Sequence, residues 1–203
     1  MMGTATHFIL VRHGQTAANL NDYVGGSTDD PLTEFGHEQA RKVAAYLKEK
    51  ASEAAAVYAS PLSRAWETAG HIGASLGIAP EKLEHLAEWD AGEWEGMKYS
   101  EISMQEGFSL EGMREPGFCP PSGEALGDVQ ARVVRTFREV AERHPSEQIV
   151  MVSHGTALAL ALAELIDDSM GAWIHYRLAN CSVSELMLGA ESELIYVNET
   201  SHL

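Results

Sequence analysis

The chain has 203 residues, 45% of them hydrophobic, which predicts one globular domain over residues 1–203 with a sizeable core. Its formal net charge of −16 argues against nucleic acid and anionic membranes as partners, and no apolar run is long enough to cross a bilayer. A small anionic substrate is compatible with this charge, because it needs only a few cations gathered in one concave site.

The N-terminus and the cysteines indicate the compartment. Residues 1–6 have neither a basic region nor an apolar stretch before the first predicted strand, so we expect no secretory signal. Cys119 and Cys181 lie far apart and form no spacing typical of a metal or redox site. We therefore expect two reduced thiols and a cytoplasmic protein, and a homo-oligomer is compatible with the sequence.

The first predicted element is a buried strand over residues 7–11 that ends in an Arg12-His13-Gly14 turn. Because the carboxyl ends of strands in a parallel sheet are where ligands bind, Arg12 and His13 would lie at the rim of a pocket. An isolated Arg-His pair is more often structural, so the functional interpretation depends on the rest of the chain.

Residues 17–30 are rich in Asn, Gly and Asp and therefore predict a loop. Within it, Asn19, Gly25 and Gly26 fit either turn geometry or contact with a phosphate. Residues 34–50 then show apolar positions at helical spacing, which predicts an amphipathic helix.

Residues 54–59 predict the second strand, and Ser60 and Pro61 after it predict a helix with a serine N-cap and a proline in its first turn. Arg64 then lies near the helix N-terminus, where unpaired N–H groups attract anions. An arginine gains nothing from the helix dipole at that end, so we expect either a binding role or a plain solvent-facing position.

A third strand is predicted near residues 82–86 and leads into a loop over residues 88–96 that contains two tryptophans. This loop would present carboxylates beside apolar rings or form an acidic surface turn. Its acidic residues are Glu88, Asp90, Glu93 and Glu95. Residues 97–121 predict a short helix and a covering loop, in which Lys98 and Arg114 are the only cations.

A long helix is predicted from Ser122 to about Arg143, with one apolar face. Arg132, Arg135 and Arg138 lie on its other face, where we expect them to be solvated.

Residues 148–152 predict a buried strand that runs into His154 and Gly155, which repeats the opening strand-His-Gly pattern. An apolar helix over residues 157–166 and short strands over residues 182–188 and 193–197 follow. The alternation of strands and helices predicts an α/β fold, with a mostly parallel sheet covered by helices on both faces.

The predicted strand ends carry Arg12, His13, Arg64 and His154, and a further one leads to Glu88. Two arginines offer planar forks that match the oxygens of a phosphoryl group. One histidine could attack phosphorus while the other donates a hydrogen bond, and a carboxyl group beside tryptophan could have a raised pKa and protonate the leaving oxygen. The set therefore predicts phosphoryl transfer.

Rival chemistries fit the sequence poorly. There is no histidine spacing typical of a metal site, no Gly-x-Ser-x-Gly elbow, no phosphate-binding loop ending in Lys-Ser/Thr and no dinucleotide-binding glycine pattern. Cys119 has no histidine near it in the sequence, so it has little support as a nucleophile.

Five motifs, each weak by itself, make a specific combination. They are Leu10-Val11-Arg12-His13-Gly14-Gln15-Thr16, Ser60-Pro61-Leu62-Ser63-Arg64-Ala65, Glu88 with Gly92 and Trp94-Glu95-Gly96, Pro121-Ser122-Gly123-Glu124, and Val152-Ser153-His154-Gly155. Through them the chain resembles the histidine phosphatase superfamily, in its phosphoglycerate mutase-like branch, over nearly its whole length.

The resemblance implies a three-layer α/β/α sandwich and a phosphohistidine mechanism without metal or cofactor. It implies that His13 is the nucleophile, Glu88 the general acid, and Arg12, Arg64 and His154 the phosphate pocket. The further substrate-binding residues that we expect are Thr16, Asn19, Gly25, Gly26, Gly155, Lys98 and Arg114. The residues alone do not decide which histidine attacks, since the arginine next to His13 favours it only modestly.

We expect a phosphomonoesterase acting on a small phosphorylated metabolite. Phosphoglycerate mutases of this branch resemble the chain but have a longer insertion with paired basic residues and a tail that shields the phosphoenzyme from water. Here the loop is short, and the sequence ends soon after the last predicted strand. A mutase is the alternative, and a non-catalytic phosphate-binding protein is another, although such a protein has no need of both an acid and a nucleophile.

Overall fold

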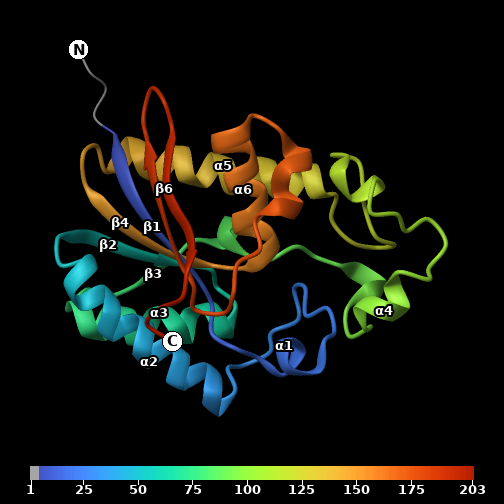
Figure 1. Ribbon diagram of the computed structural model, residues 1–203, viewed down its shortest axis with the longest axis horizontal. Helices are drawn as coiled ribbons and strands as arrows, with labels where there is room; N and C mark the ends of the chain where they lie inside the picture. Colours follow the sequence, from blue (N-terminus) through green and yellow to red (C-terminus); the bar gives the residue numbers. More distant parts are fainter. Residues whose placement is uncertain (1–4) are drawn as a thin grey trace.

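The computed structural model describes residues 5–203, so the expectation for the extreme N-terminus lies mostly outside the described residues. It confirms the α/β class, with a six-stranded sheet in the order β3-β2-β4-β1-β5-β6 (Figure 1). The strands are β1 (Thr6–Arg12), β2 (Ala54–Ala59), β3 (Glu81–Lys82), β4 (Gln148–Ser153), β5 (Val183–Leu188) and β6 (Glu193–Glu199). The first four in this order pair in parallel, whereas β5 and β6 form an antiparallel extension beside β1.

Helices cover both faces of the sheet, as expected. They are α1 (Ala17–Asn21), α2 (Glu34–Lys50), α3 (Ser63–Leu76), α4 (Tyr99–Ile102), α5 (Leu126–Arg143) and α6 (Gly155–Asp167). Short 3-10 helices are η1 (Glu84–Leu86), η2 (Gly92–Trp94), η3 (Gly112–Arg114) and η4 (Met170–His175). α2 and α3 pack on one face, and α5 and α6 on the other (Figure 1). No helix within residues 5–203 is sufficiently long and apolar to traverse a membrane.

Strand β1 lies at the centre of the sheet and is buried on both faces. Phe8 and Leu10 belong to the core under α5 and α6, whereas Ile9 and Val11 belong to the core under α2 and α3. Successive side chains of a strand point to opposite faces, so a strand covered on both sides is apolar at every position. This explains the continuous apolar run that precedes Arg12.

The ends of three parallel strands are joined by backbone hydrogen bonds. The N–H of His13, just after β1, donates to the Ser153 carbonyl of β4 (3.0 Å), and the N–H of Ser60, just after β2, donates to Val152 (2.9 Å). These bonds place the residues that follow β1, β2 and β4 at one edge of the sheet.

Four boundaries differ from the sequence predictions. The third strand is only Glu81–Lys82. The chain then turns into η1, whose last residue, Leu86, is buried in the core. The predicted loop at residues 17–30 contains α1, which begins with a capping box formed by Thr16 and Asn19.

The other two differences concern helix starts. Helix α3 begins at Ser63 rather than at Ser60, because Ser60 turns its hydroxyl to His154 (2.6 Å) while Asp29 accepts hydrogen bonds from the Ser63 N–H and hydroxyl. Helix α5 begins at Leu126 rather than at Ser122, which has a left-handed backbone (φ 60°). The prediction of a solvated Arg132 is also wrong, because only 14% of its side chain is exposed.

The absence of a side chain at Gly36 lets the start of α2 pack against the turn that follows β1. A Cβ atom at Gly36 would collide with the Gln15 carbonyl oxygen, whereas a Cβ at the exposed Gly70 of α3 would meet nothing within 4 Å. We expect Gly36→Ala to lower the free energy of unfolding by about 1–3 kcal/mol through overpacking. Gly70→Ala is the control, and we expect it to stabilise the protein by up to about 1 kcal/mol. Equal urea unfolding midpoints for Gly36→Ala and the unsubstituted protein would contradict the close contact.

Candidate active site

His13 lies just after β1, and its side chain is held in one orientation. Its imidazole is 4% exposed, and Nδ1 lies 2.7 Å from the Gly14 carbonyl oxygen. A carbonyl oxygen only accepts, so Nδ1 carries the proton and Nε2 keeps a free lone pair. Burial lowers the pKa of His13 well below its usual value, and the charges of Arg12 and Arg64 lower it further. His13 is therefore a neutral imidazole at pH 7.

His154 lies after β4, with its ring centroid 5.1 Å from that of His13. Its Nε2 contacts the Ser60 hydroxyl (2.6 Å), and its Nδ1 accepts a hydrogen bond from Nε of Arg64 (3.3 Å). Burial, followed by the charges of Arg64 and His13, lowers its pKa well below the usual value. Both ring nitrogens of His154 thus have protein partners.

Arg64 is the second residue of α3 and is 3% exposed. Its two terminal nitrogens donate to the carbonyl oxygens of Thr28 and Gly26, each at 2.7 Å. The loop that contains Gly25 and Gly26 is therefore wrapped around the guanidinium group. Three of the five N–H donors of Arg64 are used in this way, which leaves two for a ligand.

Arg12 comes from the last position of β1 and reaches toward η4 and the segment after it. One terminal nitrogen donates to the Leu178 carbonyl oxygen (2.6 Å). The Nε atom is buried and has no hydrogen-bond partner within residues 5–203. A buried donor without a partner is costly, so this atom is a candidate contact for a ligand oxygen.

Glu88 follows η1 and faces the start of α6. Its carboxylate accepts hydrogen bonds from the N–H groups of Thr156 (3.1 Å) and Ala157 (3.0 Å), and from its neighbour Trp89 (3.0 Å). The carboxylate therefore caps α6 in place of an N-cap side chain, since His154 makes no such bond.

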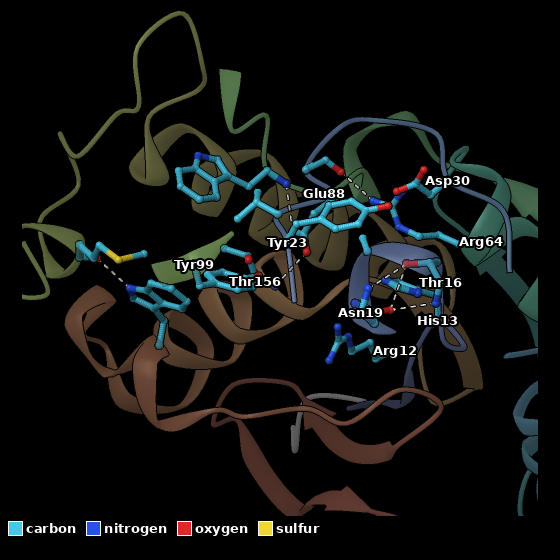
Figure 2. A pocket seen from close by; sticks show the side chains of 17 residues that line it. Arg12, His13, Thr16, Asn19, Tyr23, Asp30, Arg64, Glu88, Tyr99 and Thr156 are labelled. Atoms are coloured by element: carbon cyan, nitrogen blue, oxygen red, sulfur yellow. Dashed lines mark hydrogen bonds between the residues drawn. The ribbon is translucent and has the colours of Figure 1, made fainter. Parts of the chain in front are cut away.

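These side chains surround a cavity of about 200 Å³ (Figure 2). Of the residues predicted from the sequence, those that line it are Arg12, His13, Thr16, Asn19, Gly25, Gly26, Arg64 and Glu88. His154 is fully buried behind them, against His13 and Arg64. Among the four acids of residues 88–96, only Glu88 lines the cavity: Asp90 binds the Gly92 N–H, Glu93 the Ser122 hydroxyl, and Glu95 Ser27 and Thr28.

A second, outer cavity of about 1000 Å³ adjoins the first and shares six lining residues with it: Arg12, Glu88, Tyr99, Met113, Thr156 and Trp173. Gly155 and Arg114 line this outer cavity and not the inner one. Lys98 is exposed and lines neither cavity in the part of the chain that the structure describes. The geometry therefore gives Lys98 no contact with the site.

Several lining residues were not identified from the sequence: Tyr23, Asp30, Tyr99, Met113, Thr156 and Trp173. Only Thr156 had a signal, because it follows the second strand-His-Gly pattern. The others lie in loops or short helices whose path the local sequence does not specify. Within residues 5–203, no three His, Cys, Asp or Glu side chains are grouped in a way that could hold a metal ion.

Comparison with known proteins gives a consistent result. A profile of the histidine phosphatase superfamily (branch 1) matches residues 8–199. The chain is 30% identical over 204 residues to a protein of Mycobacterium tuberculosis that is named bifunctional; the match covers 99% of this chain but 56% of that relative, so the chain spans little more than half of its length. It is 31% identical to the uncharacterized phosphatase PhoE of Bacillus subtilis, over 98% of this chain and 97% of the relative.

Among solved structures, a phosphoserine phosphatase of Entamoeba histolytica in complex with 3-phosphoglyceric acid superposes with a TM-score of 0.87 at 27% identity. The superposition covers 98% of this chain and 99% of that one. The architecture of this chain therefore matches that of a phosphatase along nearly its full length.

The two buried histidines should make stability depend on pH. Folding lowers the pKa of each histidine below its unfolded value of about 6.5. At a pH between the folded and the unfolded pKa of a histidine, the unfolded state therefore binds more protons than the folded state. The stability from each neutral ring is fully present above about pH 6.5 and is lost as the pH falls toward the folded pKa. We expect the free energy of unfolding to fall less between pH 7.5 and 5.5 in His154→Asn than in the unsubstituted protein, by on the order of 1 kcal/mol. Urea unfolding at both pH values measures this, and parallel pH profiles would contradict it.

Proposed function

This chain belongs to the histidine phosphatase superfamily, and from that membership we propose that it hydrolyses phosphate monoesters through a phosphohistidine on His13. The observation that supports this most directly is the hydrogen bond from Nδ1 of His13 to the Gly14 carbonyl, which leaves the Nε2 lone pair free. His154 has a protein partner on each ring nitrogen, which makes it the poorer nucleophile.

Arg12 and Arg64 would bind the phosphoryl group that His13 attacks. Arg12 has an unpartnered buried Nε, and Arg64 retains two N–H donors beyond those that bind protein. Fixed donors around the three equatorial oxygens stabilise the charge of the transition state without reorganisation. His154 would support this pocket from behind by accepting the hydrogen bond from Nε of Arg64 and so holding that side chain in place.

In the first step, Nε2 of His13 forms a bond to phosphorus as the bond from phosphorus to the ester oxygen breaks. Glu88 gives its proton to that oxygen, and the alcohol leaves. In the second step, Glu88 takes a proton from water, whose oxygen attacks the phosphohistidine and releases inorganic phosphate and His13. Glu88 is the acid of residues 88–96 that lines the cavity, so it is the one placed for both transfers.

The leaving group would occupy the outer cavity, where Arg114 and Arg177 are available to a polar or anionic group. The Entamoeba histolytica relative is a phosphoserine phosphatase that was solved with 3-phosphoglyceric acid, and both names denote small phosphorylated acids. We therefore propose a small phosphorylated metabolite as the substrate, with Arg114 contacting the part that departs. Lys98 stays a sequence prediction without geometric support.

The phosphohistidine is the central test. We expect the purified protein to hydrolyse p-nitrophenyl phosphate, and rapid quenching into alkali to trap an acid-labile phosphate on His13. His13→Ala should lower kcat by about 10⁴-fold or more and abolish trapping, because the nucleophile is gone. Since the proposed steps use side chains only, EDTA should not change the rate.

The control is Arg135→Ala, which removes an exposed arginine of α5 far from the proposed chemistry. Isomerisation of 3-phosphoglycerate with negligible hydrolysis would overturn the phosphatase assignment in favour of a mutase. A protein that binds phosphate but turns over no member of a broad phosphate panel would favour a binding role instead.

Esters with different leaving groups show whether Glu88 or Asp90 is the proton donor. Proton donation matters for an alkyl phosphate but hardly for 2,4-dinitrophenyl phosphate, whose phenolate leaves unprotonated. We expect Glu88→Gln to lower kcat/KM for propyl phosphate by about 10²-fold or more and to have a much smaller effect on the dinitrophenyl ester. Asp90→Asn, which alters only the turn at Gly92, should affect both esters alike. If Asp90→Asn instead showed the selective loss, Asp90 would be the proton donor.

A further inference from the structure

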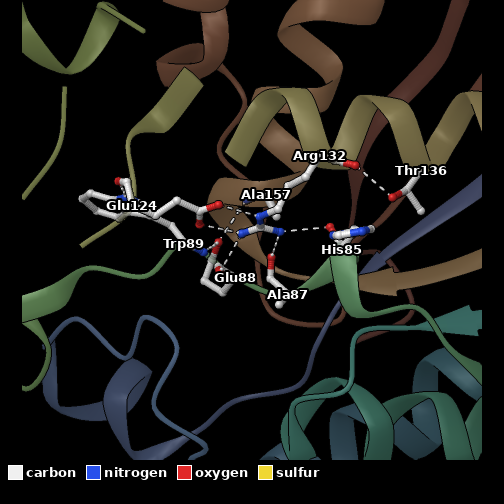
Figure 3. Close-up of polar contacts among 8 residues, drawn as sticks. All are labelled: His85, Ala87, Glu88, Trp89, Glu124, Arg132, Thr136 and Ala157. Carbon is white, nitrogen blue, oxygen red and sulfur yellow. Dashed lines mark hydrogen bonds and ion pairs between the residues drawn. The ribbon is translucent and has the colours of Figure 1, made fainter. Parts of the chain in front are cut away.

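Arg132 is a largely buried cation, with 14% of its side chain exposed, that the mechanism above does not use. It lies in the second turn of α5, and all five of its N–H donors have acceptors (Figure 3). Two of them bind the Glu124 carboxylate in a bidentate pair (2.8 and 2.9 Å). The other three donate to main-chain carbonyl oxygens that belong to a single short segment.

That segment is the one that ends in Glu88. Arg132 donates to the carbonyl oxygens of His85 (2.9 Å), Ala87 (2.7 Å) and Glu88 (3.0 Å). These carbonyls lie at the end of η1 and just after it, where no neighbouring strand or helix in the described part of the chain pairs with them. Two of the three contacts, those to Ala87 and Glu88, are partly buried, so an unpaired carbonyl there would be costly, and the guanidinium fork supplies the partners that regular secondary structure would otherwise provide.

Glu124 fixes the fork itself. It lies in the turn before α5, and its carbonyl oxygen also accepts a hydrogen bond from Nε1 of Trp89 (2.7 Å). The bidentate pair neutralises the buried charge of Arg132 and sets the plane of the guanidinium group. Glu124, Arg132 and the segment from His85 to Trp89 therefore form one connected unit, which we term the Arg132 clamp.

The clamp and the inner cavity share two adjacent residues, Glu88 and Trp89, and of these only Glu88 carries an acid group. The main chain of Glu88 is bound by Arg132 of α5, whereas its carboxylate is bound by the N–H groups of Thr156 and Ala157 in α6. Neither Arg132 nor Glu124 is among the described residues that line the inner or the outer cavity. Through hydrogen bonds, Arg132 therefore reaches the site by way of the main chain that leads to Glu88. Its charge also contributes to the lowered pKa of His154, and a lysine at position 132 would keep that charge.

We propose that Arg132 is a positioning residue for proton transfer: with Glu124, it holds the main chain from His85 to Glu88 so that the Glu88 carboxyl reaches the leaving oxygen. This inference rests on the proposed function. Loss of the fork releases three carbonyls at once and lets Glu88 shift, while His13, Arg12 and Arg64 keep their own supports. The first step then fails only when the leaving group needs the proton.

The substitution that tests the clamp is Arg132→Lys, which keeps the charge but cannot reproduce five donors in a planar fork. We expect kcat/KM for propyl phosphate to fall by about 10²-fold, and kcat/KM for 2,4-dinitrophenyl phosphate by less than about threefold. Arg135→Ala, an exposed arginine on the same helix, should match the unsubstituted protein on both esters. Glu124→Gln, which keeps its shape but loses its charge, should show the same selectivity as Arg132→Lys at a smaller amplitude.

A double-substitution cycle distinguishes positioning from general damage. If Arg132 acts through Glu88, then Arg132→Lys should cost almost nothing further on propyl phosphate in a Glu88→Gln background. A merely structural role would instead lower activity on both esters and add to the effect of Glu88→Gln. Turnover of the dinitrophenyl ester also reports that each variant is folded.

The outcomes for the clamp and for the proposed function differ. An unsubstituted protein that hydrolyses neither ester, or a Glu88→Gln variant without leaving-group selectivity, would overturn the proposed function. A selective Glu88→Gln variant combined with Arg132→Lys and Glu124→Gln variants that lose both activities equally, or lose neither, would overturn the clamp alone. If Arg132→Lys fails to fold, the selectivity of Glu124→Gln decides.

Discussion

The parallel pairing of β1 with β4 is the constraint on which the rest of the site depends. In register, Arg12 faces Ser153, so the residues that follow each strand, His13 and His154, emerge side by side. Their rings lie 5.1 Å apart although each is local to a different strand-turn unit. Because β2 pairs with the other side of β4, Ser60 reaches His154 from the opposite direction and α3 brings Arg64 over the same edge. One set of backbone hydrogen bonds thereby assembles groups from three strand ends.

Burial gives this assembly its chemical character. A histidine at the surface would be partly protonated near neutral pH, whereas His13 and His154 are buried beside two guanidinium groups that oppose a further positive charge. The same desolvation would strengthen the attraction of Arg12 and Arg64 for a phosphoryl group. The proposed phosphate site is compatible with an acidic protein, because Arg12 and Arg64 lie in the cavity itself, whereas most of the carboxylates lie outside it and are screened by water and salt.

Two arginines of this chain show how the same side chain serves different ends. Arg64 binds the carbonyls of the glycine loop, lines the cavity and keeps two N–H donors without a protein partner in the described residues, so it supports the protein and is also a candidate ligand-binding group. Arg132 has all five donors bound to protein and is not among the described residues that line the inner or the outer cavity, so its contacts stabilise only the protein. Between them lies Glu88, which receives support from two different helices. The site is therefore held by polar contacts to main chain rather than by packing alone.

The sequence by itself determined the alternation of strands and helices and the strands at residues 7–11, 54–59 and 148–152, and it singled out His13, Arg12, Arg64, His154 and Glu88 as the candidate site residues. It could do so because apolar periodicity and strand-His-Gly turns are local patterns. Tertiary structure decided what local patterns do not encode. Ser60 contacts His154 and does not cap α3. Arg132 is largely buried because the segment from His85 to Glu88 offers it carbonyls, and Tyr99 and Trp173 line the cavity because α4 and η4 lie beside it. Each of these contacts joins residues that are far apart in the chain, so it forms and contributes to stability only once the sheet has formed.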